Sequence, residues 1–277
     1  MDRHLIRRAA CLLGLAAAGC VLTRPAAGPE RPQFTFAVMA DVQYADKPAW
    51  KEGCRYFRES LDRLKDAVAA INAGRPAFAI QLGDVIDGQD TPAKSIADLD
   101  RVLGIYSRIR VPRYHVVGNH CLAAGGRSAL QPKLGLRRAY YDFTSSAAPG
   151  WRFLVLDGND PGGSPAAEPQ LRWLTETLAQ ATARKERVVV FSHFALVAEA
   201  APHDRMEQPE PVLSRIEQAG CVVACFAGHE HGGGYALRNG IQHVTMTGMV
   251  TAPQDGAWGT VEVYADHRSW DTAASPA

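Results

Sequence analysis

Two patterns of apolar residues alternate along the chain from Phe34 onward. Short apolar runs of strand length lie at 34–40, 78–83, 114–118, 152–157, 187–192 and 222–228. Longer stretches with apolar residues at helical spacing separate them, at 57–74, 94–109, 169–184 and 209–220. The first and the last of these stretches end in a glycine, as helices often do. The alternation predicts an α/β fold.

The pattern changes near the C-terminus. Residues 234–249 and 258–266 alternate with a period of two, and an Asn-Gly pair at Asn239 and Gly240 predicts a tight turn. We therefore expect a β-hairpin region to close the fold. With no internal repeat and no second boundary, the 277 residues predict one folded domain, at 34–270.

The N-terminus has the three parts of an export signal. Arg7 and Arg8 precede an apolar run at 9–18, and Gly19 and Cys20 form a small-residue exit. The run is too short for a membrane-spanning helix. Residues 1–20 thus predict export, with 21–33 as a tether and the protein periplasmic or anchored as a lipoprotein through Cys20. A mistaken start codon or a frayed tail is the alternative explanation.

Composition narrows the classes of partner. The chain is 47% hydrophobic and 21% charged, which is ordinary for a soluble globular protein, and its net charge is +1. We therefore expect no nucleic-acid partner, because nucleic-acid binding requires a basic surface. Cys221 and Cys225 lie four residues apart on a predicted strand, about 13 Å end to end, so we expect buried thiols and no bridge between them.

Side chains that can bind metals follow five of the six predicted strands. In α/β sheets, ligands bind beyond the carboxyl ends of the strands. Each residue alone has an ordinary explanation, such as a turn cap or a core histidine. Together they predict a metal site. The candidates are Asp41, Gln43, Asp84, Asn119, His193, His229 and His231.

The order of these motifs resembles the calcineurin-like metallophosphoesterases, whose usual first motif is Asp-x-His where this chain has Asp41-x-Gln43. Within that superfamily the chain looks like the manganese-dependent ADP-ribose/CDP-alcohol diphosphatases. The segments that carry this likeness are ADVQYAD (40–46), RYFRESL (55–61), QLGDVIDG (81–88), AGHEHGGGY (227–235) and TAPQDGAWGTVEVY (251–264). The resemblance implies a four-layer αββα sandwich, in which two mixed sheets are flanked by helices.

The resemblance also implies two divalent metal ions with Asp84 as the bridging ligand. One ion would take Asp41, Gln43, Asp84 and His231, and the other Asp84, Asn119, His193 and His229. Two such ions can share a hydroxide that attacks phosphorus in line. The amide oxygen of Gln43 is a harder ligand than imidazole, which favours Mn²⁺, with Zn²⁺ or Fe²⁺ as alternatives.

The implied activity is cleavage of the diphosphate bond in ADP-ribose, CDP-alcohols or similar compounds, which gives a nucleoside monophosphate and a phosphorylated product. Asp84 and His120 are the catalytic candidates, His120 as an acid or as a donor to a phosphoryl oxygen. Cys121 stands where the superfamily usually has a carboxylate, so we expect a poorly oriented His120 and therefore favour diphosphate substrates. A broad phosphodiesterase or phosphomonoesterase, and a catalytically silent metal-binding protein, are the alternatives.

Residues that bind the rest of the substrate are less apparent from the sequence. Trp50 could stack on a base or cover the core, and Arg55 could reach a phosphate or lie on the surface. Tyr44 belongs to the same resembling segments. The stretch 201–211, which contains His203, differs from the family's corresponding loop. The remaining candidates for structural or surface roles are His115, His243 and His267.

Overall fold

The computed structural model describes residues 31–50, 54–160, 162, 164, 166–251, 257–265 and 272–273. The export signal at 1–20 with Cys20, most of the tether at 21–33, and His267 lie outside this range. Export, lipid anchoring and the domain boundaries therefore stay predictions.

The first sheet has the strand order β11-β10-β1-β2-β3. Its parallel part comprises β1 (Phe34–Met39), β2 (Ala79–Gln81) and β3 (Arg113–His115). On the other side, β10 (Trp258–Val263) pairs antiparallel with β1, and β11 (Thr272–Ala273) pairs antiparallel with β10.

The second sheet has the order β4-β5-β6-β7-β9-β8. Four strands run parallel: β5 (Trp151–Val155), β6 (Arg187–Phe191), β7 (Val222–Ala227) and β9 (Ile241–Thr245). Antiparallel strands form both edges, β4 (Tyr141–Phe143) beside β5 and β8 (Gly234–Arg238) beside β9. The predicted Asn-Gly turn joins β8 to β9, with positive φ at Asn239 (50°) and Gly240 (77°).

Aromatic rings fill the space between the two sheets. Phe36 and Phe78 from the first sheet stack with centroids 5.1 Å apart, and Phe153 and Phe191 of the second sheet meet them edge-on. All four are fully buried. Because strands buried on both faces read as continuous apolar runs, these residues gave the strong strand signals in the sequence.

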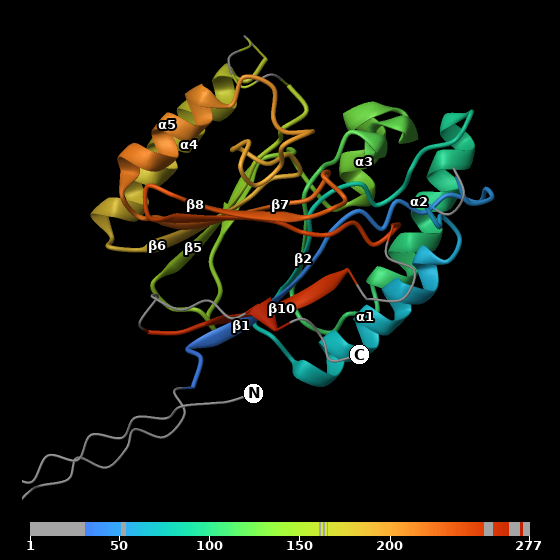
Figure 1. The fold of residues 1–277 in the computed structure, drawn as a ribbon, viewed down its shortest axis with the longest axis horizontal. Helices are drawn as coiled ribbons and strands as arrows, with labels where there is room; N and C mark the ends of the chain where they lie inside the picture. Colours follow the sequence, from blue (N-terminus) through green and yellow to red (C-terminus); the bar gives the residue numbers. More distant parts are fainter. Residues whose placement is uncertain are drawn as a thin grey trace, which may run out of the picture. The chain divides into compact units, whose positions relative to one another are not determined.

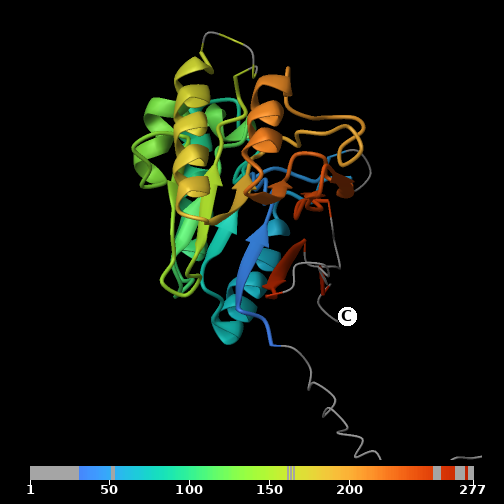
Figure 2. The same ribbon diagram turned by 90° about the vertical axis from the view of Figure 1, so that its left-hand side faces the viewer.

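Helices cover the outer faces (Figures 1 and 2). Those that pack on the first sheet are α1 (Ser60–Gly74), α2 (Pro92–Tyr106) and α3 (Gly126–Lys133), and those on the second are α4 (Glu168–Ala183) and α5 (Glu210–Ala219). Figure 2 shows α4 and α5 side by side. The expectation of two mixed sheets flanked by helices is confirmed.

The structure also differs from the sequence-based elements. The apolar run at 78–83 gives a strand of only three residues, because the left-handed backbone at Gly83 (φ 101°) and Asp84 (φ 49°) ends it. The pattern missed β4, β11, α3 and the 3₁₀ turn at His120–Ala124, which are too short for a period of two or 3.6 to be recognised.

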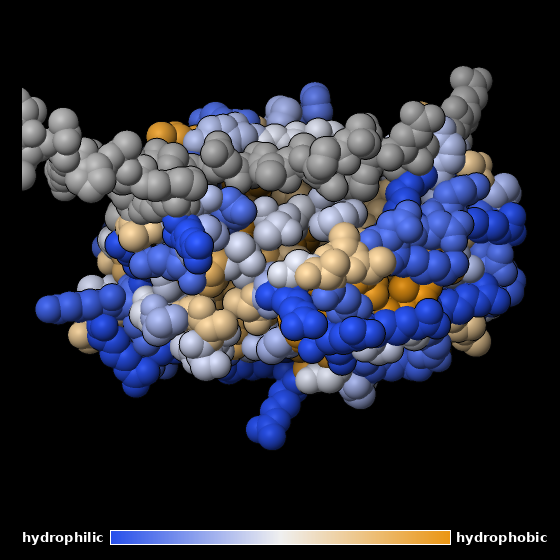
Figure 3. Space-filling view, turned by 90° about the horizontal axis from the view of Figure 1, so that it is seen from below, coloured by the Kyte–Doolittle hydropathy of each residue, from blue (hydrophilic) through white to orange (hydrophobic). Residues whose placement is uncertain are grey.

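The described cysteines are Cys54, Cys121, Cys221 and Cys225, and all carry free thiols. Cys225 is buried as expected, but Cys221 is only partly buried, so the expectation of two buried thiols is wrong for Cys221. Within the described residues, no helix is both long and apolar enough to cross a bilayer. The face in Figure 3 is mainly hydrophilic, with hydrophobic residues in small areas between hydrophilic ones.

Candidate metal centre

The candidate ligands sit directly after the parallel strands of both sheets. Asp41 and Gln43 follow β1, Asp84 follows β2, and His229 follows β7. All four have left-handed backbones, with φ of 52°, 43°, 49° and 69° in that order. Such conformations are unfavourable for residues with a side chain and gather at functional sites.

Glycines allow the backbones to approach these side chains closely. A Cβ at Gly118 would overlap the Asp84 carboxylate, and one at Gly228 would lie 2.7 Å from Asp41 Oδ2. Both positions follow strands of different sheets, β3 and β7. The glycine-containing motifs thus leave room for carboxylates at the point where the two sheets meet.

One part of the centre gathers around Asp84. His193 Nε2 lies 3.2 Å from Asp84 Oδ2 and 3.0 Å from Asn119 Oδ1. Ligand atoms of Asp84, His193 and His229 all lie within 4.8 Å of one another. The side chains predicted to hold one ion, from the ends of four separate strands, are therefore brought together.

The other part gathers around Asp41. His231 Nε2 lies 3.7 Å from Asp41 Oδ1, and the buried Gln43 follows on the same loop. Asp41 Oδ2 accepts a hydrogen bond from the His229 backbone N–H at 3.0 Å. This contact links the loop after β1 to the loop after β7.

The oxygens of this centre fit divalent cations. Asp41 Oδ1, Gln43 Oε1 and Asp84 Oδ2 are buried and accept no hydrogen bond from any described residue. Asp41 and Asp84 are 0% exposed, and a buried carboxylate without a cation is very unfavourable. Oxygen and imidazole ligands of this kind suit Mn²⁺, Zn²⁺ or Fe²⁺.

Protonation of the side chains reflects this excess of buried negative charge. Burial raises the pKa of Asp41 to about 7. Burial alone would lower the pKa of His193, but the carboxylates of Asp84 and Asp41 outweigh it and raise that pKa to about 9. Burial and the charge of Arg55 lower the pKa of His231 to about 4, which keeps its imidazole neutral as a metal ligand requires.

His120 has a carboxylate neighbour, which corrects the expectation drawn from Cys121. Its Nδ1 donates to the Asp87 carbonyl oxygen at 2.8 Å and lies 3.4 Å from Asp87 Oδ1. The Cys121 thiol is buried and accepts from the Val85 backbone N–H at 3.2 Å, and burial raises the pKa of Cys121 to about 12. The chemical argument that favoured diphosphates over diesters is therefore wrong. The Gly-Asp-Val-Ile-Asp spacing, with Asp87 three residues after Asp84, was the missed signal.

Two cations share Asp87 with His120. Lys47 Nζ contacts Asp87 Oδ2, and Arg55 Nη1 lies 3.4 Å from Asp87 Oδ1. Sequence reasoning proposed Arg55 but missed Lys47. Because the charge of Arg55 also acts on Asp41 and His231, positive charge lies beside the metal centre.

The other proposed substrate residues lie in different surroundings. Trp50 is 49% exposed with the Arg55 guanidinium 5.5 Å from its ring centroid, so it does not cover the core. Tyr44 is buried, and its hydroxyl accepts from Arg101 Nη1 at 2.9 Å. Substrate roles for these residues stay predictions.

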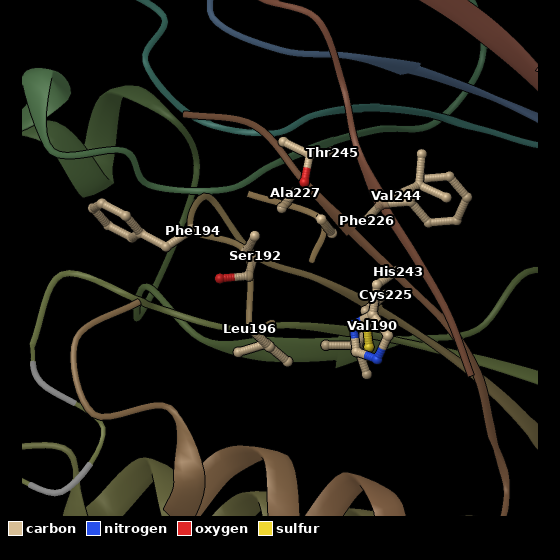
Figure 4. A pocket seen from close by; sticks show the side chains of 12 residues that line it. Val190, Ser192, Phe194, Leu196, Cys225, Phe226, Ala227, His243, Val244 and Thr245 are labelled. Atoms are coloured by element: carbon tan, nitrogen blue, oxygen red, sulfur yellow. The ribbon is translucent and has the colours of Figure 1, made fainter. Parts of the chain in front are cut away.

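Two hollows in the described part of the chain lie apart from the ligands. The one in Figure 4 holds only about 10 Å³ and is lined by Ser192, His243 and Thr245 among others. The second, of about 430 Å³, is lined by residues including His115 and Arg113. Neither is lined by a candidate ligand, and His115 and His243 are buried as the sequence predicted for structural histidines.

Comparison with known proteins defines the class of protein. A sequence model of the calcineurin-like phosphoesterase family matches residues 34–233. The chain belongs to this family and is a metal-dependent hydrolase of phosphoester or phosphoanhydride bonds.

Two of the relatives that match the chain carry the same name. The manganese-dependent ADP-ribose/CDP-alcohol diphosphatase of Oryza sativa subsp. japonica is 32% identical, over 87% of this chain and 91% of that protein. The Homo sapiens protein of the same name is 30% identical, over 84% and 88%. The crystal structure of a dimetal phosphatase from Danio rerio aligns with a TM-score of 0.74 at 29% identity, over 85% of this chain and 94% of that one.

Proposed function

We propose that this phosphoesterase hydrolyses the diphosphate bond of nucleoside diphosphate-X compounds such as ADP-ribose and CDP-alcohols. The products are a nucleoside monophosphate and a phosphorylated partner. The observation that carries the proposal is the cluster of buried oxygens on Asp41, Gln43 and Asp84, which lie beside the candidate histidine ligands and have no hydrogen-bond partner among the described residues. The names of the relatives at 30–32% identity supply the substrate class.

The candidate ligands would hold two divalent ions, and Asp84 would contribute to both. When bound, the ions supply Lewis-acid stabilisation of phosphoryl oxygens and a water of lowered pKa. Gln43 gives its site an amide oxygen in place of imidazole, which supports Mn²⁺ as the resident ion.

In this proposal His120 would serve the phosphoryl group or the leaving oxygen. Because a carbonyl oxygen only accepts, the 2.8 Å contact with Asp87 O fixes the N–H on Nδ1. Nε2 is then the atom that exchanges a proton or, when protonated, donates to oxygen. The Asp87 carboxylate lies beside the His120 ring, and Lys47 and Arg55 add positive charge that suits an anionic diphosphate.

Export remains part of the proposal. Residues 1–20 would direct the chain to the periplasm, with cleavage before Cys20 if it is lipidated. Mass spectrometry of the mature N-terminus checks this, since an intact Met1 in cytosolic protein contradicts it.

The test is turnover of ADP-ribose, CDP-choline, a cyclic nucleotide and a simple monoester, each with Mn²⁺, Mg²⁺ and Zn²⁺ in turn. We expect highest kcat/KM for the two diphosphates with Mn²⁺, and loss of nearly all turnover in Asp84→Asn. Highest kcat/KM for the cyclic nucleotide or the monoester identifies the broad esterase instead. No turnover of any substrate, with metal bound, identifies a silent metal-binding protein.

A further inference from the structure

The imidazole of His229 has a carboxylate at one of its two nitrogens. Asp204 Oδ2 lies 2.8 Å from His229 Nε2. A carboxylate can only accept, so Nε2 carries the proton and donates it. Nδ1 of His229 is thereby left with the lone pair that a metal ion needs.

His193 shows the same arrangement with its nitrogens exchanged. Its Nδ1 donates to the Leu82 carbonyl oxygen at 2.8 Å, and its Nε2 faces Asn119 Oδ1 at 3.0 Å. Histidine ligands generally donate their second ring N–H to a carboxylate or carbonyl, which fixes the tautomer and raises the basicity of the ligand. Both histidines therefore have one nitrogen held by an acceptor, which leaves the other nitrogen free to bind a metal ion.

The chain holds Asp204 in place from the residues that follow it. Met206 is 2% exposed, and its N–H donates to the Ala195 carbonyl oxygen at 2.9 Å. The Glu207 carbonyl oxygen accepts from the Gly162 N–H at 2.8 Å. The Asp204 side chain itself is 63% exposed, so burial does not force it against His229.

We propose that Asp204 is a positioning residue for His229. The Asp204 carboxylate accepts the Nε2–H of His229, and so directs His229 Nδ1 to the metal ion shared with Asp84, Asn119 and His193. The role rests on the proposed metal centre. Asp204 lies in the stretch 201–211, outside the segments that carry the family resemblance.

The experiment measures Mn²⁺ binding to the chelator-stripped full-length protein by calorimetry. Asp204→Asn keeps the size of the side chain but removes the charge, and we expect the affinity for one of two ions to fall about 10–100-fold. Asp204→Glu, which retains the carboxylate, should recover most of the loss. Asp90→Asn is the matched control, because Asp90 is also exposed, at 68%, and ion-paired, at 2.9 Å to Lys94.

A second readout is the ¹⁵N spectrum of labelled histidines in the metal-free protein. His229 should be the Nε2–H tautomer in the wild type and lose that preference in Asp204→Ala. Equal Mn²⁺ affinities in wild type, Asp204→Asn and Asp204→Ala, or an Nδ1–H tautomer in the wild type, overturn the inference and leave the proposed function standing. A wild-type protein that binds no Mn²⁺ overturns the proposed function. In that case the ¹⁵N spectrum still tests whether Asp204 accepts the Nε2–H of His229.

Discussion

At the scale of single residues, the candidate metal centre is defined by three buried oxygens. Asp41 and Asp84 are 0% exposed and Gln43 is 1% exposed, and each has an oxygen without a donor among the described residues. Gln43 is the member that distinguishes this chain from the usual Asp-x-His motif of the superfamily it resembles. Its neutral amide oxygen makes the site harder without adding charge.

Gln43→His tests this tuning of the metal. The substitution restores an imidazole, so the preference should move from Mn²⁺ towards Zn²⁺ or Fe²⁺. The measurement is competition between Mn²⁺ and Zn²⁺ for the stripped protein, followed by metal analysis. An unchanged ratio of bound metals would show that Gln43 does not set the preference.

His120→Gln separates the two roles of His120. If its proton assists the leaving group, hydrolysis of an alkyl phosphodiester should fall by about 10²–10⁴-fold, because an alkoxide is a basic leaving group. Cleavage of ADP-ribose should fall much less, since a phosphate monoester leaves without that help. The comparison is kcat/KM for both substrates in the variant and the wild type. Equal losses on both would make His120 a phosphoryl-oxygen donor.

At the scale of elements, the ends of the strands decide where the ligands lie. β2 is short because the chain turns away at Gly83, and the loops after β2 and β3 carry Asp84 and Asn119. The loops pack so tightly that Gly118 lies against the Asp84 carboxylate and backbone N–H. A close approach of this kind has no tolerance for a methyl group.

Gly118→Ala is therefore expected to destabilise the protein by about 1–3 kcal/mol and to weaken Mn²⁺ binding, because the new Cβ must displace Asp84. Gly104→Ala is the control, since nothing lies within 4 Å of a Cβ at that position of α2. The control should stabilise the helix by up to about 1 kcal/mol. Urea unfolding and calorimetry of both variants measure these effects, and a neutral Gly118→Ala would show that the loop can relax.

At the scale of the whole molecule, the free energy of unfolding should depend on one buried histidine at the edge of the first sheet. Burial, with a smaller contribution from Arg113, lowers the pKa of His115 from 6.5 to about 4. Below pH 6.5 the unfolded chain binds a proton that the folded protein excludes, so stability falls as the pH drops from 6.5 to about 4. The loss amounts to about 3 kcal/mol and then levels off.

His115→Phe isolates this effect, because a phenyl ring can pack on Tyr106 as the imidazole does, with ring centroids 4.7 Å apart in the wild type. Urea unfolding between pH 4 and 7.5 should show a flatter dependence in the variant. Parallel curves for variant and wild type would mean that His115 is protonated in the folded state without cost.

The sequence alone determined the α/β class, the main strands and helices, and the family. It could do so because residues buried on both faces of a sheet, such as Phe36 and Phe153, read as continuous apolar runs, and the ligand motifs follow those runs at short range. The seven candidate ligands also follow one another along the chain in the order of the motifs of the family that the sequence resembles.

Only the tertiary structure decided which side chains stand next to the ligands. Asp87 meets His120 across 33 residues of chain, and Asp204 meets His229 although its loop carried no motif. Such contacts depend on how loops from different strands converge, and neither hydrophobic period nor local spacing encodes this. The sequence therefore determined the candidate ligands, while the packing of the two sheets determined which charges and hydrogen-bond acceptors lie beside them.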